Sequence, residues 1–391
     1  MRKDWEIKKL GEVCEFGNGQ AHEKFVDDEG EFILVNSKFI SSEGEVVKRT
    51  NKQLSPLFKN DIVFVMSDVP NGKALAKCFL IDKDNSYTLN QRICVIRSGN
   101  YETKYLLYHL NRHEYLLSFN NGENQTNLRK NDILNCPLVT PPIPEQKRIV
   151  SILDQAFAAI NKAKANAEQN LLNAKELFES VLNSLIIDDG KLKMEKLGDV
   201  CEIKGRIGYR GYTVQDLVQK GEGAITLSPS NIQDNKFITD KCTYISWFKY
   251  EESPEIMVFE GDILFVKTGS TYGKVALVEN LPEKATINPQ FVVLKDIKCS
   301  NRFLYFALTT KAFKEKVENI VGGAATPTLS QTNLAEQTIP LPPLKEQLTI
   351  VRQLDALRAE TKKLEAVYQK KIVDLEELKK SILQKAFAGE L

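Results

Sequence analysis

The chain of 391 residues is 42% hydrophobic and 27% charged, with a formal net charge of +1. Its length exceeds what one ordinary hydrophobic core holds, and its composition excludes a disordered or fibrous protein. The near-neutral charge also excludes a nucleic-acid binder that depends on a large basic excess, so affinity for nucleic acid would require a local arrangement of charges.

The first 144 residues have the pattern of an α+β domain. Short β-branched and aromatic runs alternate with turn residues, which predicts strands at Phe32–Val35, Ile62–Met66, Cys78–Ile81 and Ile93–Arg97. We expect one helix over Thr103–Phe119, because apolar residues recur there at three- and four-residue spacing.

A long helix should follow this domain. From Pro144 to about Ile187 the chain has no further proline and no glycine. Proline in a first turn loses no hydrogen bond, and Glu145 suits the positive end of the helix dipole. Gly190 lies where a helix-ending glycine belongs. At ~1.5 Å per residue, such a helix is roughly 60 Å long.

The second half of the chain repeats this order. We expect strands at Ala224–Leu227, Ile263–Lys267, Val275–Val278 and Phe291–Lys295, and then a helix over Arg302–Val321. A second long helix should run to about Phe387, and Gly389 is placed to end it.

Four sequence landmarks confirm that the two halves are copies of one module. The matching pairs are Leu10-Gly11-Glu12-Val13 with Leu197-Gly198-Asp199-Val200, Asn60-Asp61-Ile62 with Gly261-Asp262-Ile263, Thr88-Leu89-Asn90 with Thr286-Ile287-Asn288, and Pro142-x-x-Glu145-Gln146 with Pro343-x-x-Glu346-Gln347. We therefore predict globular domains at residues 1–144 and 191–345, and long helices at residues 145–190 and 346–391.

The two long helices carry matching heptad patterns. One seam is rich in alanine, and the other holds large side chains such as Leu354, Leu364 and Leu378. Small residues facing large ones predict that the helices pair. Asn170 and Lys371 occupy the same heptad position near the middle of each helix, and we expect them to fix the register of the pair. The alternative is that each helix packs only on its own domain.

The usual catalytic signatures are missing from the sequence. Residues Gly269 to Lys274 resemble a phosphate-binding loop, but their spacing is too short, and no Gly-x-Ser-x-Gly is present. His109 and His113 lie four residues apart on an expected helix without the glutamate of a zinc protease, which favours ordinary surface histidines. We expect no catalytic centre, no metal and no cofactor in this chain.

Cysteine usage and hydropathy indicate where the protein works. Seven scattered cysteines form no Cys-x-x-Cys pair, and most lie in apolar stretches, so we expect reduced and buried thiols. No apolar run approaches the ~20 residues of a membrane helix, and the N-terminus is not an apolar signal segment. These features predict a cytoplasmic protein with no membrane partner.

Taken together, the repeated landmarks closely resemble the specificity subunit of type I restriction–modification enzymes. The resemblance covers essentially the whole chain. Its most specific parts are the two Pro-Pro-x-x-Glu-Gln helix entries, the domain starts, and the stretches Arg206–Thr213 and Leu383–Leu391.

The resemblance implies a fold and a set of partners. Each globular part would be a target recognition domain that reads one half of a split double-stranded DNA sequence. The helices would form an antiparallel coiled coil that sets the gap between the half-sites, and they would dock two adenine methyltransferase subunits, which bind S-adenosylmethionine. A motor-nuclease restriction subunit would be a further partner. Successive major grooves recur about every 34 Å along DNA, a separation that rigid helices of this length can set.

DNA contacts are expected from turn-like stretches that mix basic, amide and aromatic residues. Arginine can pair with guanine or hold phosphate, amides suit adenine edges, and glycine allows close backbone approach. For any one of these residues, the competing interpretation is an ordinary solvated loop side chain. The candidates are Asn18, Gln20, His22, Lys24, Asn71 and Lys73, then Asn124, Gln125, Asn127, Arg129 and Lys130, and in the second domain Lys204, Arg206, Tyr209, Arg210, Tyr212, Ser270, Tyr272 and Lys274.

Three other interpretations remain open from the residues. The chain could be the target-reading subunit of a methyltransferase system that lacks a nuclease. It could instead be a coiled-coil scaffold whose globular ends bind proteins, which the neutral charge favours. The third is an enzyme with carboxylate chemistry that no common motif marks. The last two do not explain why each helix is joined to its own diverged globular domain.

Overall fold

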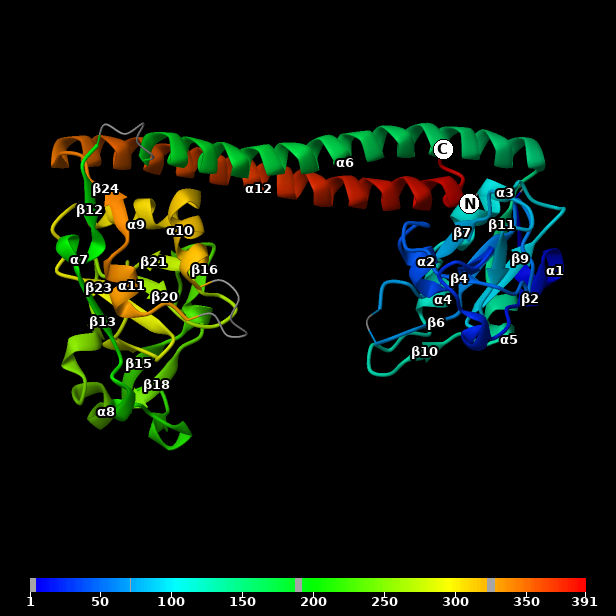
Figure 1. Ribbon diagram of the computed structural model, residues 1–391. Helices are drawn as coiled ribbons and strands as arrows, with labels where there is room; N and C mark the ends of the chain where they lie inside the picture. Colours follow the sequence, from blue (N-terminus) through cyan, green and yellow to red (C-terminus); the bar gives the residue numbers. More distant parts are fainter. Residues whose placement is uncertain (1–4, 71, 187–191, 322–327) are drawn as a thin grey trace. The chain divides into compact units, whose positions relative to one another are not determined.

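The structure is a computed structural model that describes residues 5–70, 72–186, 192–321 and 328–391, except for the side chain of Tyr209 (Figure 1). The chain forms two compact units. The first comprises residues 1–167 together with 371–391, and the second comprises residues 168–370. Each unit contains one globular part and a portion of both long helices.

The first unit is built on an antiparallel four-stranded sheet. Its strand order is β2 (Glu15–Asn18), β9 (Ile93–Arg97), β5 (Ile62–Val65), β7 (Cys78–Leu80). A smaller sheet has the order β4 (Arg49–Thr50), β3 (Phe32–Val35), β8 (Tyr87–Leu89). Two further pairs are β1 (Glu6–Lys9) with β11 (Pro137–Thr140), and β6 (Ser67–Asp68) with β10 (Thr126–Asn127).

Short helices complete the globular part of the first unit. They are α1 (Leu10–Val13), η1 (Glu23–Phe25), α2 (Ser37–Ser41), α3 (Thr103–Leu110), α4 (Glu114–Leu117) and α5 (Lys130–Leu134). The long helices are α6 (Ile143–Ile186) and α12 (Leu344–Ala388).

The second unit repeats the four-stranded sheet and enlarges the smaller one. The first has the order β13 (Glu202–Gly205), β23 (Phe291–Lys295), β20 (Ile263–Val266), β21 (Val275–Leu277). The second has the order β14 (Leu217–Val218), β18 (Thr243–Ser246), β15 (Gly223–Leu227), β22 (Ala285–Ile287), β19 (Met257–Val258). The remaining pairs are β12 (Met194–Lys196) with β24 (Thr338–Pro340), and β16 (Ile232–Gln233) with β17 (Lys236–Phe237).

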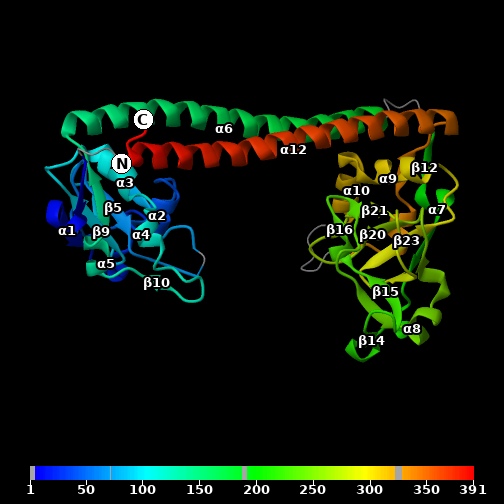
Figure 2. The same ribbon diagram turned by 180° about the vertical axis from the view of Figure 1, so that it is seen from behind.

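The helices of the second unit can be followed in Figure 2, which shows the chain from behind. They are α7 (Leu197–Val200), η2 (Gly208–Arg210), η3 (Val214–Asp216), η4 (Pro229–Asn231), α8 (Trp247–Glu251), η5 (Pro254–Ile256), α9 (Asn301–Thr309), α10 (Lys311–Val321) and α11 (Gln331–Ala335). The matched sheets confirm two copies of one α+β module.

Each predicted strand lies within one residue of an observed one, but the single helix expected after them is wrong in both copies. In the first unit the helix breaks at Asn111 and Arg112. The Asn111 side chain accepts a hydrogen bond of 3.0 Å from Cys78 N, and Arg112 has a φ of 60°. In the second unit Thr310 ends α9, and its hydroxyl then accepts from Phe313 N at the start of α10.

Equivalent residues brace both sheets. Arg97 donates two hydrogen bonds of 2.6 Å to Asp61, and Lys295 lies 2.9 Å from Asp262 at the matching position. These acidic residues follow Asn60 (φ 72°) and Gly261 (φ 89°). Both positions are left-handed, which explains why one copy has asparagine and the other glycine.

The glutamine of the Pro-Pro-x-x-Glu-Gln landmark is buried at the start of each long helix and acts as a clamp. The Gln146 side-chain oxygen accepts from Glu102 N at 2.8 Å, and its amide donates to Pro141 O at 2.9 Å. Gln347 accepts from Ser300 N at 2.9 Å and donates to Pro342 O at 2.8 Å. Glu102 and Ser300 are the N-caps of α3 and α9, so the glutamine joins each long helix to the preceding globular part.

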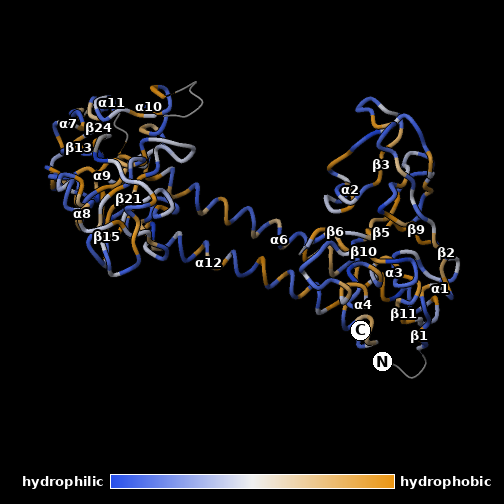
Figure 3. The backbone as a smooth tube through the Cα atoms, turned by 90° about the horizontal axis from the view of Figure 1, so that it is seen from below, coloured by the Kyte–Doolittle hydropathy of each residue, from blue (hydrophilic) through white to orange (hydrophobic). Residues whose placement is uncertain are grey.

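The two long helices run antiparallel beside each other within each unit. In the first, Lys164 lies 2.6 Å from Glu376, and Arg148 donates to Leu391 O. In the second, the Arg358 guanidinium lies over the ring of Phe178. Residue numbers therefore rise along one helix as they fall along the other. Figure 3 shows hydrophilic and hydrophobic residues alternating along both helices.

Each globular core is completed by the start of one long helix and the end of the other. The first core contains Leu153 and Phe157 of α6 together with Ala386 of α12. Phe387 of α12 packs against this core. The second contains Leu354 of α12 with Leu182 and Ile186 of α6. The alternative in which each helix packs only on its own domain is therefore wrong.

Part of the predicted seam between the helices is also wrong. Asn170 and Lys371 are exposed, so neither is a buried polar residue that fixes register. Leu177, Leu364 and Leu378 are exposed as well, at 42 to 47% of their surface. The buried residues in the middle part of the two helices include the small side chains Ala167, Ala174 and Thr361. The heptad pattern therefore predicted that the two helices pair, but it did not predict correctly which side chains along them are buried.

Candidate nucleic-acid interface

The predicted loops of the first domain meet at one edge of the four-stranded sheet. In the strand register Asn18 is opposite Cys94, and Val65 is opposite Ile93. Because β2 and β5 both end where β9 begins, the loops at 19–24, 66–73 and 90–92 emerge together. Of these candidates Asn18, Gln20, Lys24 and Lys73 are exposed, and Asn71 lies outside the described residues.

The third predicted stretch joins the same edge through backbone pairing. Thr126 and Asn127 of β10 are opposite Asp68 and Ser67 of β6, and Leu128 N donates to Met66 O at 2.8 Å. This pairing brings together loops that are separated by more than fifty residues in the sequence. The exposed candidates here are Asn124, Gln125, Asn127, Arg129 and Lys130.

His22 differs from its neighbours because it is fully buried. Its Nδ1 lies 2.7 Å from Gln20 O, and its Nε2 lies 2.9 Å from the hydroxyl of Thr88. Both ring nitrogens thus contact the protein itself. The geometry indicates that His22 holds the loop in place while Gln20 and Lys24 face solvent.

The second domain presents the same edge. Gly205 is opposite Val292, and Val266 is opposite Phe291, so the loops at 206–212, 267–274 and 288–290 meet as in the first domain. The edge also contacts the chain after α10, since Leu329 N donates to Lys267 O at 2.8 Å.

Arg206 takes the structural role that His22 has in the first copy. It is 6% exposed and donates to Ile287 O, to Arg210 O, and to the hydroxyl of Thr286, the counterpart of Thr88. Its guanidinium also lies over the Tyr212 ring at 5.2 Å. Burial lowers the pKa of Arg206, which reflects the cost of holding a cation inside the domain. Arg206 therefore shapes the loop from within.

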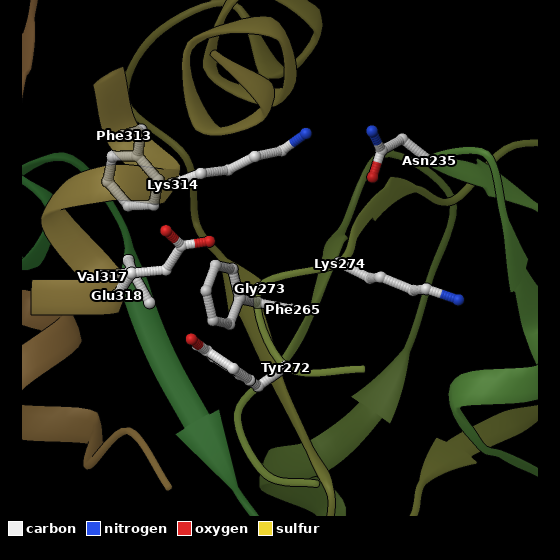
Figure 4. Close-up of a pocket in the computed structure, with 9 residues that line it drawn as sticks. All are labelled: Asn235, Phe265, Tyr272, Gly273, Lys274, Phe313, Lys314, Val317 and Glu318. Carbon is white, nitrogen blue, oxygen red and sulfur yellow. The ribbon is translucent and has the colours of Figure 1, made fainter. Parts of the chain in front are cut away.

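The remaining candidates of the second domain have varied surroundings. Lys204 pairs with Glu202 at 2.8 Å, and Arg210 pairs with Glu255 at 3.3 Å. Tyr212 is half-buried against Arg206, and the Tyr209 side chain lies outside the described residues. Ser270 is exposed, while Tyr272 and Lys274 line a cavity of about 210 Å³ between the loop and α10 (Figure 4).

Two exposed residues at these edges were not identified from the sequence. Arg92 and Gln290 follow the Thr-Leu-Asn and Thr-Ile-Asn landmarks at the same position in each copy. Arg92 O accepts from Met66 N at 3.2 Å, and Gln290 O accepts from Lys267 N at 2.8 Å, which places both at the middle of their edge. The sequence did contain a signal for both residues. Two residues after each of these matched landmarks stands a polar side chain that differs between the copies.

The histidine pair was expected on a helix surface, and this was wrong for His109. His109 is 6% exposed, its Nε2 accepts from Val139 N at 2.9 Å, and its ring lies 4.3 Å from that of Phe387. Burial, followed by the charge of nearby His113, lowers the pKa of His109 to about 3, so the ring is neutral at pH 7. Both histidines contribute to packing. In the residues that the structure describes, no group of three metal-ligating side chains comes together.

Arg206→Ala is expected to lower the free energy of unfolding of the second unit by about 2 kcal/mol. The change removes hydrogen bonds and leaves buried acceptors without their charged donor. Arg210→Ala is the matched control, because it removes a partly exposed ion pair that contributes about 0–1 kcal/mol. Urea unfolding monitored by hydrogen exchange in the second unit measures both. Equal effects of the two variants would contradict the internal role of Arg206.

Comparison with known proteins gives one consistent result. The family model for the type I restriction modification DNA specificity domain matches residues 2–169 and again residues 190–373. The chain is 22% identical to the type I restriction enzyme MjaVIII specificity subunit of Methanocaldococcus jannaschii, with 100% of this chain and 93% of that protein covered. It is 24% identical to the EcoDI specificity subunit of Escherichia coli, with 99% and 89% covered.

Solved structures share the fold. A chain from a study of complex assembly and conformational transition of the type I R-M system superposes with a TM-score of 0.80 at 19% identity, covering 100% of this chain and 99% of that one. The HsdS subunit from Thermoanaerobacter tengcongensis gives a TM-score of 0.59 at 19% identity, with 100% and 98% covered. With its two matched modules, two long helices and repeated loop edges, the chain belongs to the type I restriction–modification DNA specificity family.

Proposed function

We propose that this chain is the DNA-reading subunit of a type I restriction–modification complex, and that each globular domain reads one half of a bipartite site. The observation that carries the proposal is the edge where the three loops of each four-stranded sheet meet. In the first copy this edge exposes amide and basic side chains, and in the second it exposes the Gln290 amide with partly buried basic side chains beside it. Because the framework is shared and the loop residues differ, the two half-sites should differ in sequence.

Bases are read chiefly by the exposed residues, while the buried side chains of His22 and Arg206 hold the loops. Arg92 suits guanine or phosphate, and the Gln290 amide suits adenine. Asn124, Gln125 and Asn127 add further amides in the first domain. The near-neutral chain has few surplus cations for phosphate, so partner subunits supply much of the affinity for the DNA backbone.

The partners are two methyltransferase subunits that dock on the long helices. Exposed apolar side chains along these helices support this docking, since a helix surface facing only water has little reason to carry them. They are Leu172, Leu177, Leu364, Val367, Val373 and Leu378. S-adenosylmethionine then belongs to the methyltransferase, this chain performs no bond chemistry, and a motor-nuclease subunit is the partner for restriction.

The protein works in the cytoplasm in this proposal, where DNA and reduced thiols are found together. All seven cysteines are free thiols. Within the described part of the chain, no helix combines the length and the apolarity that crossing a membrane requires.

Methylation mapping tests the proposal. The chain is co-expressed with the methyltransferase gene beside it, and methylated adenines are mapped across the host genome. We expect a split motif in which Arg92→Ala relaxes only one half and Gln290→Ala relaxes only the other. Each lost base contact should reduce discrimination by about 1–3 kcal/mol. Lys59→Ala is the control, because Lys59 is exposed beside β5 at the opposite edge of the sheet.

Each outcome has a clear meaning. If a soluble complex with cofactor adds no methylation, the chain is better explained as a coiled-coil scaffold. If methylation occurs but Lys59→Ala alters the motif as much as Arg92→Ala, the recognition edge is misplaced. A genome that lacks a neighbouring motor-nuclease gene would favour the methyltransferase system without restriction.

A further inference from the structure

A cavity in the second unit is lined mainly by basic side chains among its charged residues. It has a volume of about 650 Å³ and lies between α6, α9, α10, α12 and the turn joining β16 to β17. Five basic residues line it, against the three acidic residues Glu179, Asp234 and Glu365. The basic residues are Lys175, Lys236, Lys314, Arg358 and Lys362.

Arg358 is held rigidly in this cavity. Its guanidinium lies over the rings of Phe178 at 5.8 Å and Tyr305 at 5.5 Å, and it donates to the Tyr305 hydroxyl at 2.9 Å. Tyr305 in turn donates to Asn235 O at 2.7 Å. A guanidinium has five N–H donors, so this arrangement fixes the group and leaves donors for a further acceptor.

The cations lack carboxylate partners. Among the described residues, no Asp or Glu oxygen forms an ion pair with Lys236, Lys314, Arg358 or Lys362, whereas Arg302 of the same unit forms two. Burial, then contact with Lys236, then the charge of Arg358 lower the pKa of Lys362. Neighbouring cations repel one another, and an anion placed among them would remove that cost.

The cluster is specific to the second copy. When the sequences of α6 and α12 are aligned on Gln146 and Gln347, Phe157 of α6 corresponds to Arg358 of α12. Phe157 is 7% exposed and packs in the first core. The matching position in the first unit is thus filled by an apolar core residue, so the basic cavity is not needed to build the module.

We propose that this cavity binds a phosphate group, either one of the nucleic-acid backbone or one on a free phosphorylated ligand. Arg358 supplies a fixed planar donor, and Lys236 and Lys362 supply mobile point charges, a combination suited to phosphate oxygens. A volume of this size also falls within the roughly 300–1,000 Å³ of small-ligand sites.

The position of the cavity favours the nucleic-acid backbone. Lys314 and Asn235 line both this cavity and the smaller one that contains Tyr272 and Lys274 of the recognition edge. Figure 4 shows the side chains of Lys314 and Asn235 extending toward one another across the smaller cavity. The basic surface of the cavity is therefore continuous with the loops proposed to read bases. The choice of the nucleic-acid backbone as the source of the phosphate rests on the proposed function.

The test compares Lys236→Met/Lys362→Met with Lys363→Met. Lys363 is the next residue on α12, is exposed, and pairs with Glu360 at 2.7 Å. Affinity for target duplex is measured against salt in the complex with methyltransferase, and pyrophosphate and ATP are titrated calorimetrically into the full chain. For backbone phosphate, the double variant should reduce the salt slope by about 1–2 relative to Lys363→Met and leave the methylated motif unchanged. For a free ligand, pyrophosphate or ATP affinity should fall at least tenfold.

Arg358→Gln is a second variant for the same two measurements, and circular dichroism shows whether it folds. If the salt slope and the pyrophosphate and ATP affinities of the double variant all equal those of Lys363→Met, the proposal is overturned. If the wild-type complex does not bind its duplex at all, the proposed function has failed instead. The titrations with pyrophosphate and ATP then decide alone whether the cavity holds phosphate.

Discussion

Removing residues 381–391 is expected to unfold the globular part of the first unit, although these residues lie at the opposite end of the sequence. Ala386 is fully buried in that core, with Ile382, Leu383 and Phe387 packed against it. The Phe387 ring lies 5.5 Å from Tyr105. A fully buried large apolar side chain contributes about 2–5 kcal/mol and a partly buried one contributes less, so losing several together approaches the 5–15 kcal/mol that stabilises a whole domain.

Hydrogen exchange resolved by segment checks this prediction. Amides of β5 and β9 should lose protection in the truncated chain, while those of β20 and β23 keep theirs. Phe387→Ala alone should cost about 3 kcal/mol. Lys385→Ala, an exposed neighbour, is the control and should cost little. Protection of β5 and β9 that survives truncation would show that the first core does not depend on the end of α12.

Gln347→Leu should lower the free energy of unfolding of the second unit by about 2–4 kcal/mol. The glutamine is 3% exposed, and its removal leaves Ser300 N and Pro342 O buried without their partner. Unsatisfied buried groups cost about 1–3 kcal/mol each. Gln146→Leu should have the same effect on the first unit, since it makes the equivalent pair of hydrogen bonds.

The control for this pair is Gln353→Leu, an exposed position two turns along α12. Chemical denaturation with hydrogen exchange assigns each loss to its unit. The prediction is wrong if Gln353→Leu destabilises as much as Gln347→Leu, or if either clamp variant destabilises both units equally. A confirmed result would give the repeated glutamine a physical reason, namely that it joins each long helix to the N-cap of α3 or α9.

Local patterns predicted most of the regular elements. Short apolar strands such as Phe32–Val35 and Phe291–Lys295 were found as expected, because side chains on both faces are at least partly buried and turn residues bound the runs closely. The helix after them was predicted as one piece and is two. Apolar spacing continues through Asn111, but the helix ends there, where Asn111 accepts a hydrogen bond from Cys78 of β7 and Arg112 has a left-handed backbone.

The structure brings the loops predicted to contact DNA to one edge of each four-stranded sheet, because antiparallel register places the ends of those strands side by side. The sequence did not predict this shared edge. Composition could not separate Arg206 and His22, which hold the loops from inside, from the exposed Arg92 and Gln290. That distinction depends on contact with Thr88 and Thr286, which are distant in sequence.

By itself, the sequence determined the duplicated α+β module, the two long helices and the resemblance to type I specificity subunits. These follow from local spacing, from proline and glycine positions, and from motifs that recur along the chain. The tertiary structure alone decided which helix faces are buried, that each core takes the end of the other copy's helix, and that five basic residues of the second unit share one cavity. Such contacts join residues far apart in the sequence, as with Tyr105 and Phe387, which are 282 positions apart. Periodicity can show that a segment has an apolar face, but it does not show which distant segment packs against that face.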